Sequence, residues 1–274
     1  MKKKICFIGG GNMAEAMIAG MVSASYEPQS ICAVDRNESK RDLLKKKYGI
    51  RVSASLINEV EQADTVVLAI KPQQMAELIL EIKDIVKNQL IVTVAAGLEV
   101  SVYEKLFSKQ ICFSRAIPNT PSSVGYGATG VYFNSNATAS HKQEVKEMMG
   151  SMGIVEVVED ENMIDVIAAC ASSGPAYYLQ FMEHMVEATV NQGLDKTKAE
   201  RLIIQTCLGA AEMAKQSEQN ISTLRKNVTS KKGITAEALG VFENADLKNI
   251  TARAITANIS RAKELSKEMA EKLV

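Results

Sequence analysis

A glycine-rich turn near the start of the chain constrains its fold more than any other feature. The segment FIGGGNMAEAM places Gly9-x-Gly11-x-x-Ala14 directly after an apolar run and at the start of a helical pattern. There Gly9 permits a sharp turn, Gly11 lets the backbone approach a pyrophosphate, and Ala14 permits close packing of a helix on a sheet. The pattern predicts a dinucleotide-binding strand–turn–helix unit. The alternative is a glycine turn that only packs a helix on a sheet.

The first half of the chain alternates β-branched apolar runs with helical patterns, which is typical of βαβ units around a parallel sheet. The expected strands are residues 4–8, 31–35, 65–70, 90–95, 111–115, 130–133 and 154–158. The expected helices are residues 13–23, 39–48, 73–86, 100–107 and 140–149. Continuous apolar strands such as TVVLAI indicate that helices cover both faces of the sheet.

The second half of the chain is helical. After residue 158 the strand-like runs end, and helical periodicity dominates over 177–192, 196–215 and 247–272. We expect a Rossmann-type domain over residues 1–161 and an all-α dimerisation domain over 162–274. The last helix carries a regular apolar stripe, made of Ile250, Ala254, Ile255, Ile259, Ala262 and Leu265. We expect a second copy of the chain to bury that stripe; burial within its own domain is the alternative.

Composition argues against several classes of protein. Because 32 Lys and Arg balance 32 Asp and Glu, nucleic acid is not expected as a partner. The apolar runs are far shorter than the roughly 20 residues of a membrane span, and the N-terminus lacks the pattern of a signal peptide. Five scattered cysteines favour reduced thiols in a cytoplasmic protein. With two histidines, neither a metal site nor histidine acid–base chemistry is expected.

Three strand ends supply further candidates for cofactor binding. At the second strand, Asp35 would hydrogen-bond the 2′-hydroxyl of NAD, whereas Arg36 would pair with the 2′-phosphate of NADP, so the choice of cofactor stays open. The segments AIKPQ and RAIPNTP place Lys71-Pro72 and Asn119 at two other strand ends. Ligands of open α/β sheets bind outside these carboxyl ends. Ordinary strand termination is the alternative for both segments.

Two segments of the helical half combine a helix start with polar groups. In ASSGPAYY, Pro175 stands where a first helical residue is expected. In NVTSKKGITAEAL, Ser230 and Thr235 flank Gly233 before a new helix. Such a helix start can hold a carboxylate through backbone N–H groups while a threonine hydroxyl donates to the reacting group. Helix capping is the alternative role of these hydroxyls.

Five segments, in this order, resemble the pyrroline-5-carboxylate reductase family over essentially the full length of the chain. They are FIGGGNMAEAM, VVLAIKPQ, RAIPNTP, SSGPAYY and NVTSKKGITAEAL. The resemblance implies a Rossmann domain, a helical domain that forms homodimers, and in some members a ring of dimers. It also implies hydride transfer from NADPH or NADH to the C=N carbon of a cyclic imine, 1-pyrroline-5-carboxylate, which yields L-proline.

The resemblance also assigns roles to individual residues. The cofactor phosphates would be held by Gly9, Gly11, Asn12 and Met13. The cofactor ribose and nicotinamide would lie near Ala69, Lys71, Pro72 and Asn119. The substrate carboxylate and ring nitrogen would be bound by Ser230, Gly233 and Thr235. Thr235 would be the catalytic donor to that nitrogen.

The chain departs from the family pattern at three places. The usual Ser-Pro-Gly-Gly of the substrate loop is replaced by Ser-Lys-Lys-Gly at 230–233, the usual Gly-Ser-Gly-Pro by Ser-Ser-Gly-Pro at 172–175, and an asparagine is missing around 55–56. The lysine pair leaves two alternatives open, a non-catalytic paralogue that binds nucleotide or proline-like ligands and a reductase of a related imine. A β-hydroxyacid dehydrogenase is disfavoured, because it needs a lysine within 170–192, where this chain has none.

Overall fold

The computed structural model describes residues 3–273 and contains two compact units. The first extends to Pro175 and includes the residues from Asn258 onward, and the second is Ala176–Ala257. The first unit includes helix α7 (Asn162–Ile167) and the π-helical turn Ala168–Ser172, which pack on the sheet. The boundary expected between residues 161 and 162 stays a prediction.

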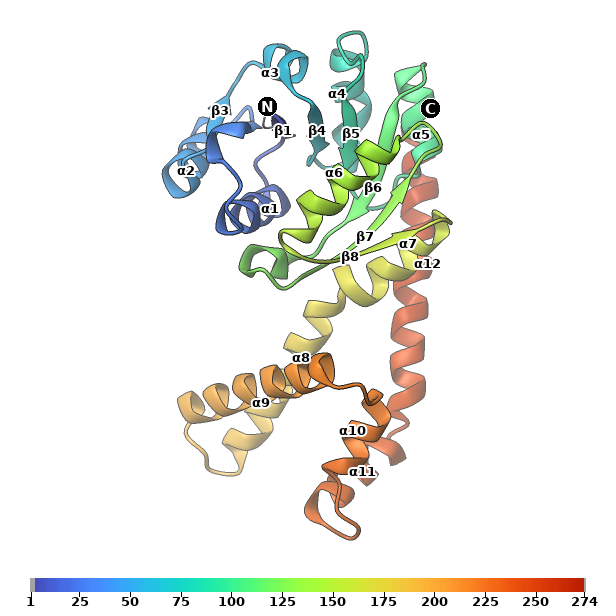
Figure 1. Ribbon diagram of the computed structural model, residues 1–274. Helices are drawn as coiled ribbons and strands as arrows, with labels where there is room; N and C mark the ends of the chain where they lie inside the picture. Colours follow the sequence, from blue (N-terminus) through green and yellow to red (C-terminus); the bar gives the residue numbers. More distant parts are fainter. Residues whose placement is uncertain (1–2, 274) are drawn as a thin grey trace. The chain divides into compact units, whose positions relative to one another are not determined.

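One eight-stranded sheet forms the first unit, in the order β3-β2-β1-β4-β5-β6-β7-β8 (Figure 1). The strands are β1 (Ile5–Ile8), β2 (Ile31–Val34), β3 (Arg51–Ser53), β4 (Thr65–Leu68), β5 (Leu90–Thr93), β6 (Cys112–Ile117), β7 (Gly127–Phe133) and β8 (Gly153–Val158). All neighbours are parallel except β6 and β7, whose short connection cannot cross over the sheet. The chain runs outward from β1 to β3 and returns to β4, so the order reverses beside β1. Ligands of doubly wound folds bind at such a reversal.

Helices cover both faces of this sheet, as expected (Figure 1). They are α1 (Asn12–Ser23), α2 (Glu38–Tyr48), α3 (Leu56–Gln62), α4 (Met75–Ile82), α5 (Val100–Phe107) and α6 (Ala139–Gly150). Alternate residues of β1 divide the core: Ile5 and Phe7 lie in the cluster with α1, α2 and α6. Cys6 and Ile8 lie in the cluster with α3, α4 and α5. This alternation follows from the two-residue period of a strand.

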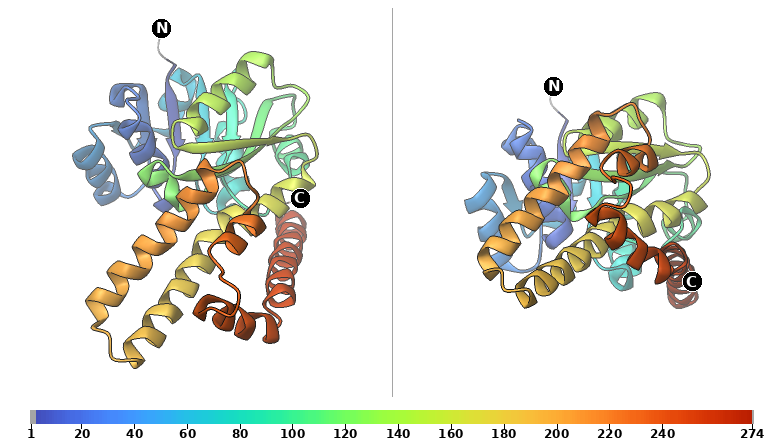
Figure 2. Two further views of the ribbon diagram at one scale, coloured as in Figure 1. Left: turned by 60° about the horizontal axis from the view of Figure 1, so that its bottom comes forward. Right: turned by 90° about the horizontal axis from the view of Figure 1, so that it is seen from below.

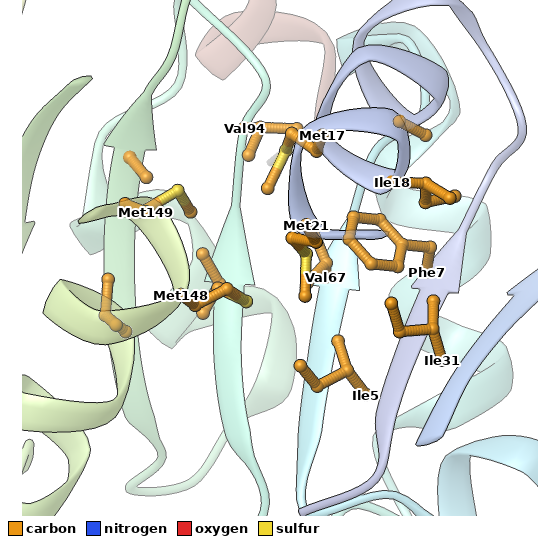
Figure 3. Packing of buried hydrophobic residues seen from close by; sticks show 14 of the residues in the cluster. Ile5, Phe7, Met17, Ile18, Met21, Ile31, Val67, Val94, Met148 and Met149 are labelled. Atoms are coloured by element: carbon orange, nitrogen blue, oxygen red, sulfur yellow. The ribbon is translucent and has the colours of Figure 1, made fainter. Parts of the chain in front are cut away.

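The core beneath α1 combines methionine, aromatic and β-branched side chains. Figure 3 shows Phe7 of β1 next to Met21 and Ile18 of α1. Met148 and Met149 belong to α6, which covers the neighbouring strands. Phe7, Ile18 and Met21 are all completely buried. The three flexible thioethers fill the irregular space between helix and sheet, for which methionine is well suited. This packing holds the glycine-rich turn, which joins β1 to α1.

Two thiols lie side by side inside the sheet. Cys6 of β1 pairs in register with Cys32 of β2. Both side chains are buried, and burial raises the pKa of Cys32 to about 12 and raises the pKa of Cys6 as well. At neutral pH the two groups are therefore protonated thiols that pack as small apolar side chains.

Three local details differ from the sequence-based expectation. Strand β3 and helix α3 were not expected, and the helix expected over 73–86 is a 3₁₀ turn, Pro72–Gln74, followed by the shorter α4. Strand β3 has three half-buried residues at the edge of the sheet, so it lacks the apolar run that marks a central strand. Pro72 has no N–H group and starts the tighter turn.

The second unit is helical, as expected. Its helices are α8 (Gly174–Asn191), α9 (Lys196–Gln216), α10 (Ile221–Asn227), α11 (Ile234–Asn244) and the first part of α12 (Leu247–Leu273). Helices α8 and α9 lie side by side (Figure 2), with an open groove of about 820 Å³ along their shared length. Among residues 3–273 no helix combines the length and the apolar character that a bilayer crossing requires.

A buried ion cluster joins α5, β6 and α7 in the first unit. The side chain of Arg115, 3% exposed, donates to Glu161 Oε1 at 3.2 Å and to Asp165 Oδ1 at 2.8 Å. Glu161 Oε1 also accepts from the N–H of Val100 at 2.8 Å. Burial raises the pKa of Glu161, so burial opposes its charge and the guanidinium offsets part of this cost. Arg115 therefore compensates two carboxylates at once.

We expect Arg115→Leu to destabilise the fold by about 3–5 kcal/mol, because it leaves two partly buried carboxylates without their cation. The matched variant Glu161→Gln should cost far less, since an amide oxygen still accepts from Val100 and carries no charge to bury. Urea unfolding followed by circular dichroism measures both. Equal losses in the two variants would contradict the compensating role of Arg115.

Candidate functional site

The glycine-rich turn lies at the end of β1 and touches the end of β4. Gly9 has φ +103°, and a Cβ atom there would lie 2.6 Å from the carbonyl oxygen of Ala69. Only glycine fits this close approach. Gly11 is extended and caps α1, and a Cβ atom there would have no atom within 4 Å. The turn is therefore closed toward the sheet at Gly9 and open at Gly11, on the side where the helix N-terminus would receive a phosphate.

Asp35, directly after β2, ties the turn to the neighbouring strand. Its Oδ2 accepts from the N–H of Gly10 at 2.8 Å, and its Oδ1 accepts from the N–H of Asn37 at 2.8 Å. The ammonium group of Lys40 lies 3.9 Å from Oδ2. Each carboxylate oxygen keeps a second lone pair for a ribose hydroxyl. Asp35 thus has a positioning role that was not expected from the sequence.

A cleft of about 330 Å³ opens beside this turn, at the carboxyl ends of β1 and β2. Of the expected cofactor residues it brings together Gly9, Asp35 and Arg36. The opposite wall is one face of α4 and the turn before it, formed by Gln74, Glu77, Leu78 and Glu81. Sequence reasoning missed this wall. The spacing 74, 77, 78 and 81 marks a single helix face and was the available signal.

The other expected cofactor residues lie along the same edge of the sheet. Asn12 is exposed and Met13 half-buried in the first turn of α1. Lys71 is exposed and Pro72 half-buried directly after Ala69 and Ile70. These residues follow β1 and β4, whose carboxyl ends meet beside the glycine-rich turn. Their contacts with a cofactor stay a prediction.

Asn119, another of the expected cofactor residues, has a buried side chain whose two polar atoms are both hydrogen-bonded within the protein. It is 5% exposed. Its Nδ2 donates to the carbonyl of Ala171 at 3.0 Å, and its Oδ1 accepts from the N–H of Ala128 at 3.0 Å. The amide therefore links the end of β6 to β7 and to the π-helical turn before α8. Its place beside a nicotinamide stays a prediction.

The expected substrate residues lie in the loop before α11 and in the first turn of that helix, all within the second unit. The N–H of Gly233 donates to the carbonyl of Ser230 at 3.0 Å, and a Cβ atom at Gly233 would lie 2.1 Å from Ser230 Oγ. Gly233 is the N-cap of α11 and contributes no side-chain cap. Thr235 is exposed in the first turn of α11, so the helix-cap alternative does not describe it. It therefore lies in the turn whose N–H groups lack intrahelical partners.

Lys232 in the same loop has a left-handed backbone. Its φ is +58°, a conformation that costs a residue with a side chain on the order of 1 kcal/mol. The family pattern has glycine at this position, so the departure noted in the sequence carries backbone strain. Lys231 and Lys232 are both exposed. The loop therefore keeps its glycine-type backbone despite the lysine pair.

Two family models match the chain. Residues 161–265 match the model described as pyrroline-5-carboxylate reductase dimerisation. Residues 4–97 match the model described as NADP oxidoreductase, coenzyme F420-dependent. The two matches correspond to the helical half and to the part of the sheet that carries the cleft.

Pyrroline-5-carboxylate reductases, both curated proteins and solved structures, are similar to this chain over nearly its full length. A curated pyrroline-5-carboxylate reductase from Vibrio alginolyticus is 40% identical over 267 residues, which cover 97% of this chain and 98% of that protein. One from Haemophilus influenzae is 34% identical, and the match covers 96% of this chain and 97% of that protein. The solved Coxiella burnetii pyrroline-5-carboxylate reductase has TM-score 0.91 and 40% identity, with 97% of this chain and 99% of that one covered. The Plasmodium falciparum pyrroline carboxylate reductase, solved with NADP bound, has TM-score 0.88 and 26% identity, with coverage of 97% and 98%.

We expect Gly11→Val to abolish binding of NADH and NADPH while the fold persists, because the new side chain enters open space at the phosphate position. The contrasting variant Gly9→Ala should lose about 2 kcal/mol of stability, because its Cβ would clash with Ala69. Titration calorimetry and thermal unfolding separate the two effects. Unchanged cofactor affinity in Gly11→Val would remove the phosphate assignment.

Proposed function

The chain belongs to the pyrroline-5-carboxylate reductase family. We propose that the cleft of the first unit binds the cofactor and that the start of α11, with the loop before it, binds the substrate. The reaction is the NAD(P)H-dependent reduction of 1-pyrroline-5-carboxylate to L-proline. The observation that supports this reaction is the 40% identity with the Vibrio alginolyticus enzyme over nearly the full length of both chains. We retain residues 1–161 as the cofactor domain and 162–274 as the substrate and dimerisation domain.

The residues around the glycine-rich turn fit a dinucleotide. The open position at Gly11, the N-terminus of α1 and the carboxylate of Asp35 are the groups that hold pyrophosphate and ribose in such folds. Gly9, Gly11, Asn12 and Met13 would hold the phosphates, and Ala69, Lys71 and Pro72 would flank the ribose. Asn119 would lie near the nicotinamide. When bound, the reduced nicotinamide supplies the hydride, and the NADP of the Plasmodium falciparum relative supports such a cofactor here.

The loop before α11 supplies polarisation and orientation. A hydride adds to the C=N carbon only if that carbon is electron-poor, so the imine nitrogen must be protonated or hydrogen-bonded. The Thr235 hydroxyl would donate to that nitrogen, and Ser230 and the N–H groups around Gly233 would hold the carboxylate. The positive end of the α11 dipole favours this anion. Since a cyclic imine can arrive already protonated, no histidine is required as a proton source.

Steady-state oxidation of NADH and NADPH with 1-pyrroline-5-carboxylate tests the proposed reaction. Turnover with either cofactor supports it. Intact cofactor binding without turnover would favour the non-catalytic paralogue, for which the strained loop at Lys232 is the supporting observation. Turnover of a related imine alone would favour the second alternative.

We expect Thr235→Ala to lower kcat/KM for the imine by about 10- to 1,000-fold, the usual cost of removing one such donor. Cofactor affinity should stay the same. The matched variant Thr235→Ser keeps a hydroxyl and should retain most of the activity. If Thr235→Ala turns over at the parent rate, the assignment of Thr235 as donor is wrong.

The helical half belongs to a dimerisation family, and we propose a homodimer that can assemble further into a ring. Large apolar side chains are exposed on α8 and α9: Leu179 (62%), Leu202 (60%) and Ile204 (59%). A partner subunit would bury them, since contiguous exposed patches of this kind mark interfaces. The free thiols of all five cysteines agree with the reducing conditions of the cytoplasm, which we propose as its compartment.

We expect Leu202→Glu to shift the chain from dimer toward monomer, because a charge would enter the proposed interface. Analytical ultracentrifugation measures the mass. Leu80→Glu is the matched control, since Leu80 is equally exposed, at 60%, but lies on α4 of the first unit. A dimer that persists in Leu202→Glu would exclude α9 from the interface.

A further inference from the structure

We propose that Glu77 and Glu81 of α4 determine the choice of cofactor and give this chain a preference for NADH over NADPH. The two carboxylates would act by holding Arg36 and by making the cleft around it negative. The inference rests on the proposed role of this cleft in binding the adenosine end of the dinucleotide.

Arg36 stands directly after Asp35, where the residue that reads the ribose 2′-position is expected. Its Nη2 lies 3.1 Å from Glu77 Oε1 and 3.1 Å from Glu81 Oε1. The two glutamates are four residues apart, so they lie on one face of α4, and both line the cleft. The cation available to a 2′-phosphate is therefore already bound to two carboxylates.

The charges that line the cleft do not balance. Three carboxylates, Asp35, Glu77 and Glu81, face two cations, Arg36 and Lys40. Lys40 is also engaged, because its Nζ lies 3.9 Å from Asp35 Oδ2. A phosphate monoester carries about 1.5 to 2 negative charges at pH 7. A neutral 2′-hydroxyl can donate to Asp35, whereas a 2′-phosphate adds negative charge to a cleft whose lining has a net charge of −1.

The ion pairs with Arg36 do not decide the preference by themselves. The side chains of Arg36, Glu77 and Glu81 are 81%, 64% and 42% exposed, so each pair contributes little and can be broken. If Arg36 turned to a phosphate, however, the two glutamates would remain in the cleft without a cation. Their repulsion of the phosphate would then offset the attraction of Arg36.

The next basic residue along α2 does not change this result. Arg41 Nη1 donates to the carbonyl of Asp35 at 2.8 Å and to that of Arg36 at 3.2 Å. Its guanidinium therefore holds the backbone at the end of β2. Arg36 is the side chain whose orientation α4 controls.

The test is the double variant Glu77→Gln/Glu81→Gln. The parent should show a higher kcat/KM with NADH than with NADPH. The double variant should raise the NADPH/NADH ratio of kcat/KM by about tenfold, because two like charges near the phosphate are removed. Adding Arg36→Gln to the double variant should reverse most of that gain. Asp84→Asn, which removes an exposed carboxylate just after α4 and outside the cleft, should leave the ratio unchanged.

A binding measurement separates this inference from the proposed reaction. Calorimetry with 2′,5′-ADP and 5′-AMP needs no imine and no hydride transfer. The double variant should bind 2′,5′-ADP about tenfold more tightly than the parent and 5′-AMP with unchanged affinity. If 2′,5′-ADP binds more tightly to the double variant but the parent shows no reductase activity, the role of the two glutamates is supported and the proposed reaction is rejected. A parent that prefers NADPH, or a double variant with unchanged selectivity for 2′,5′-ADP, would overturn the inference.

Discussion

The contact between Gly9 and the carbonyl of Ala69 is the constraint on which the rest of the site depends. With 2.6 Å between a Cβ at this position and that oxygen, the chain must turn over the end of β4 without a side chain. The turn then starts α1 with Gly11 facing open space, and Asp35 fastens Gly10 to the end of β2. Three strand ends thus meet at one point, beside which the sheet order reverses. A cofactor cleft follows from this packing because the reversal leaves no helix over that point.

Much of this arrangement could be predicted from local sequence, and the parts that could not have a common physical cause. Strand positions such as Thr65–Leu68 and the helix Val100–Phe107 follow from apolar periodicity, and Gly9 and Gly11 follow from spacing. The spacing of the α4 wall marks a helix face, but no local pattern shows that this face lies across the cleft from the end of β2. The same is true of Asn119, whose amide bonds reach residues 128 and 171.

The proposed cofactor cleft and the proposed substrate loop differ in how their groups are held. The cleft of the first unit is built on close backbone packing at Gly9 and on a carboxylate held by two backbone N–H groups. The loop before α11 is exposed and stores strain at Lys232. Specificity for the dinucleotide can therefore be set by the net charge of the cleft, to which Glu77 and Glu81 contribute. Recognition of the small substrate depends on a few hydroxyl and amide groups at one helix start.

The neighbouring thiols of Cys6 in β1 and Cys32 in β2 bear on where oxidation of the protein begins. Peroxides and alkylating reagents attack the thiolate, and burial keeps Cys6 and Cys32 protonated. Cys170, by contrast, is exposed in the π-helical turn that leads into α8. Oxidative ageing would therefore begin at this turn and spare the centre of the sheet. A maleimide dye would likewise find its first target at Cys170, which makes this residue a natural handle for labelling the protein without disturbing its core.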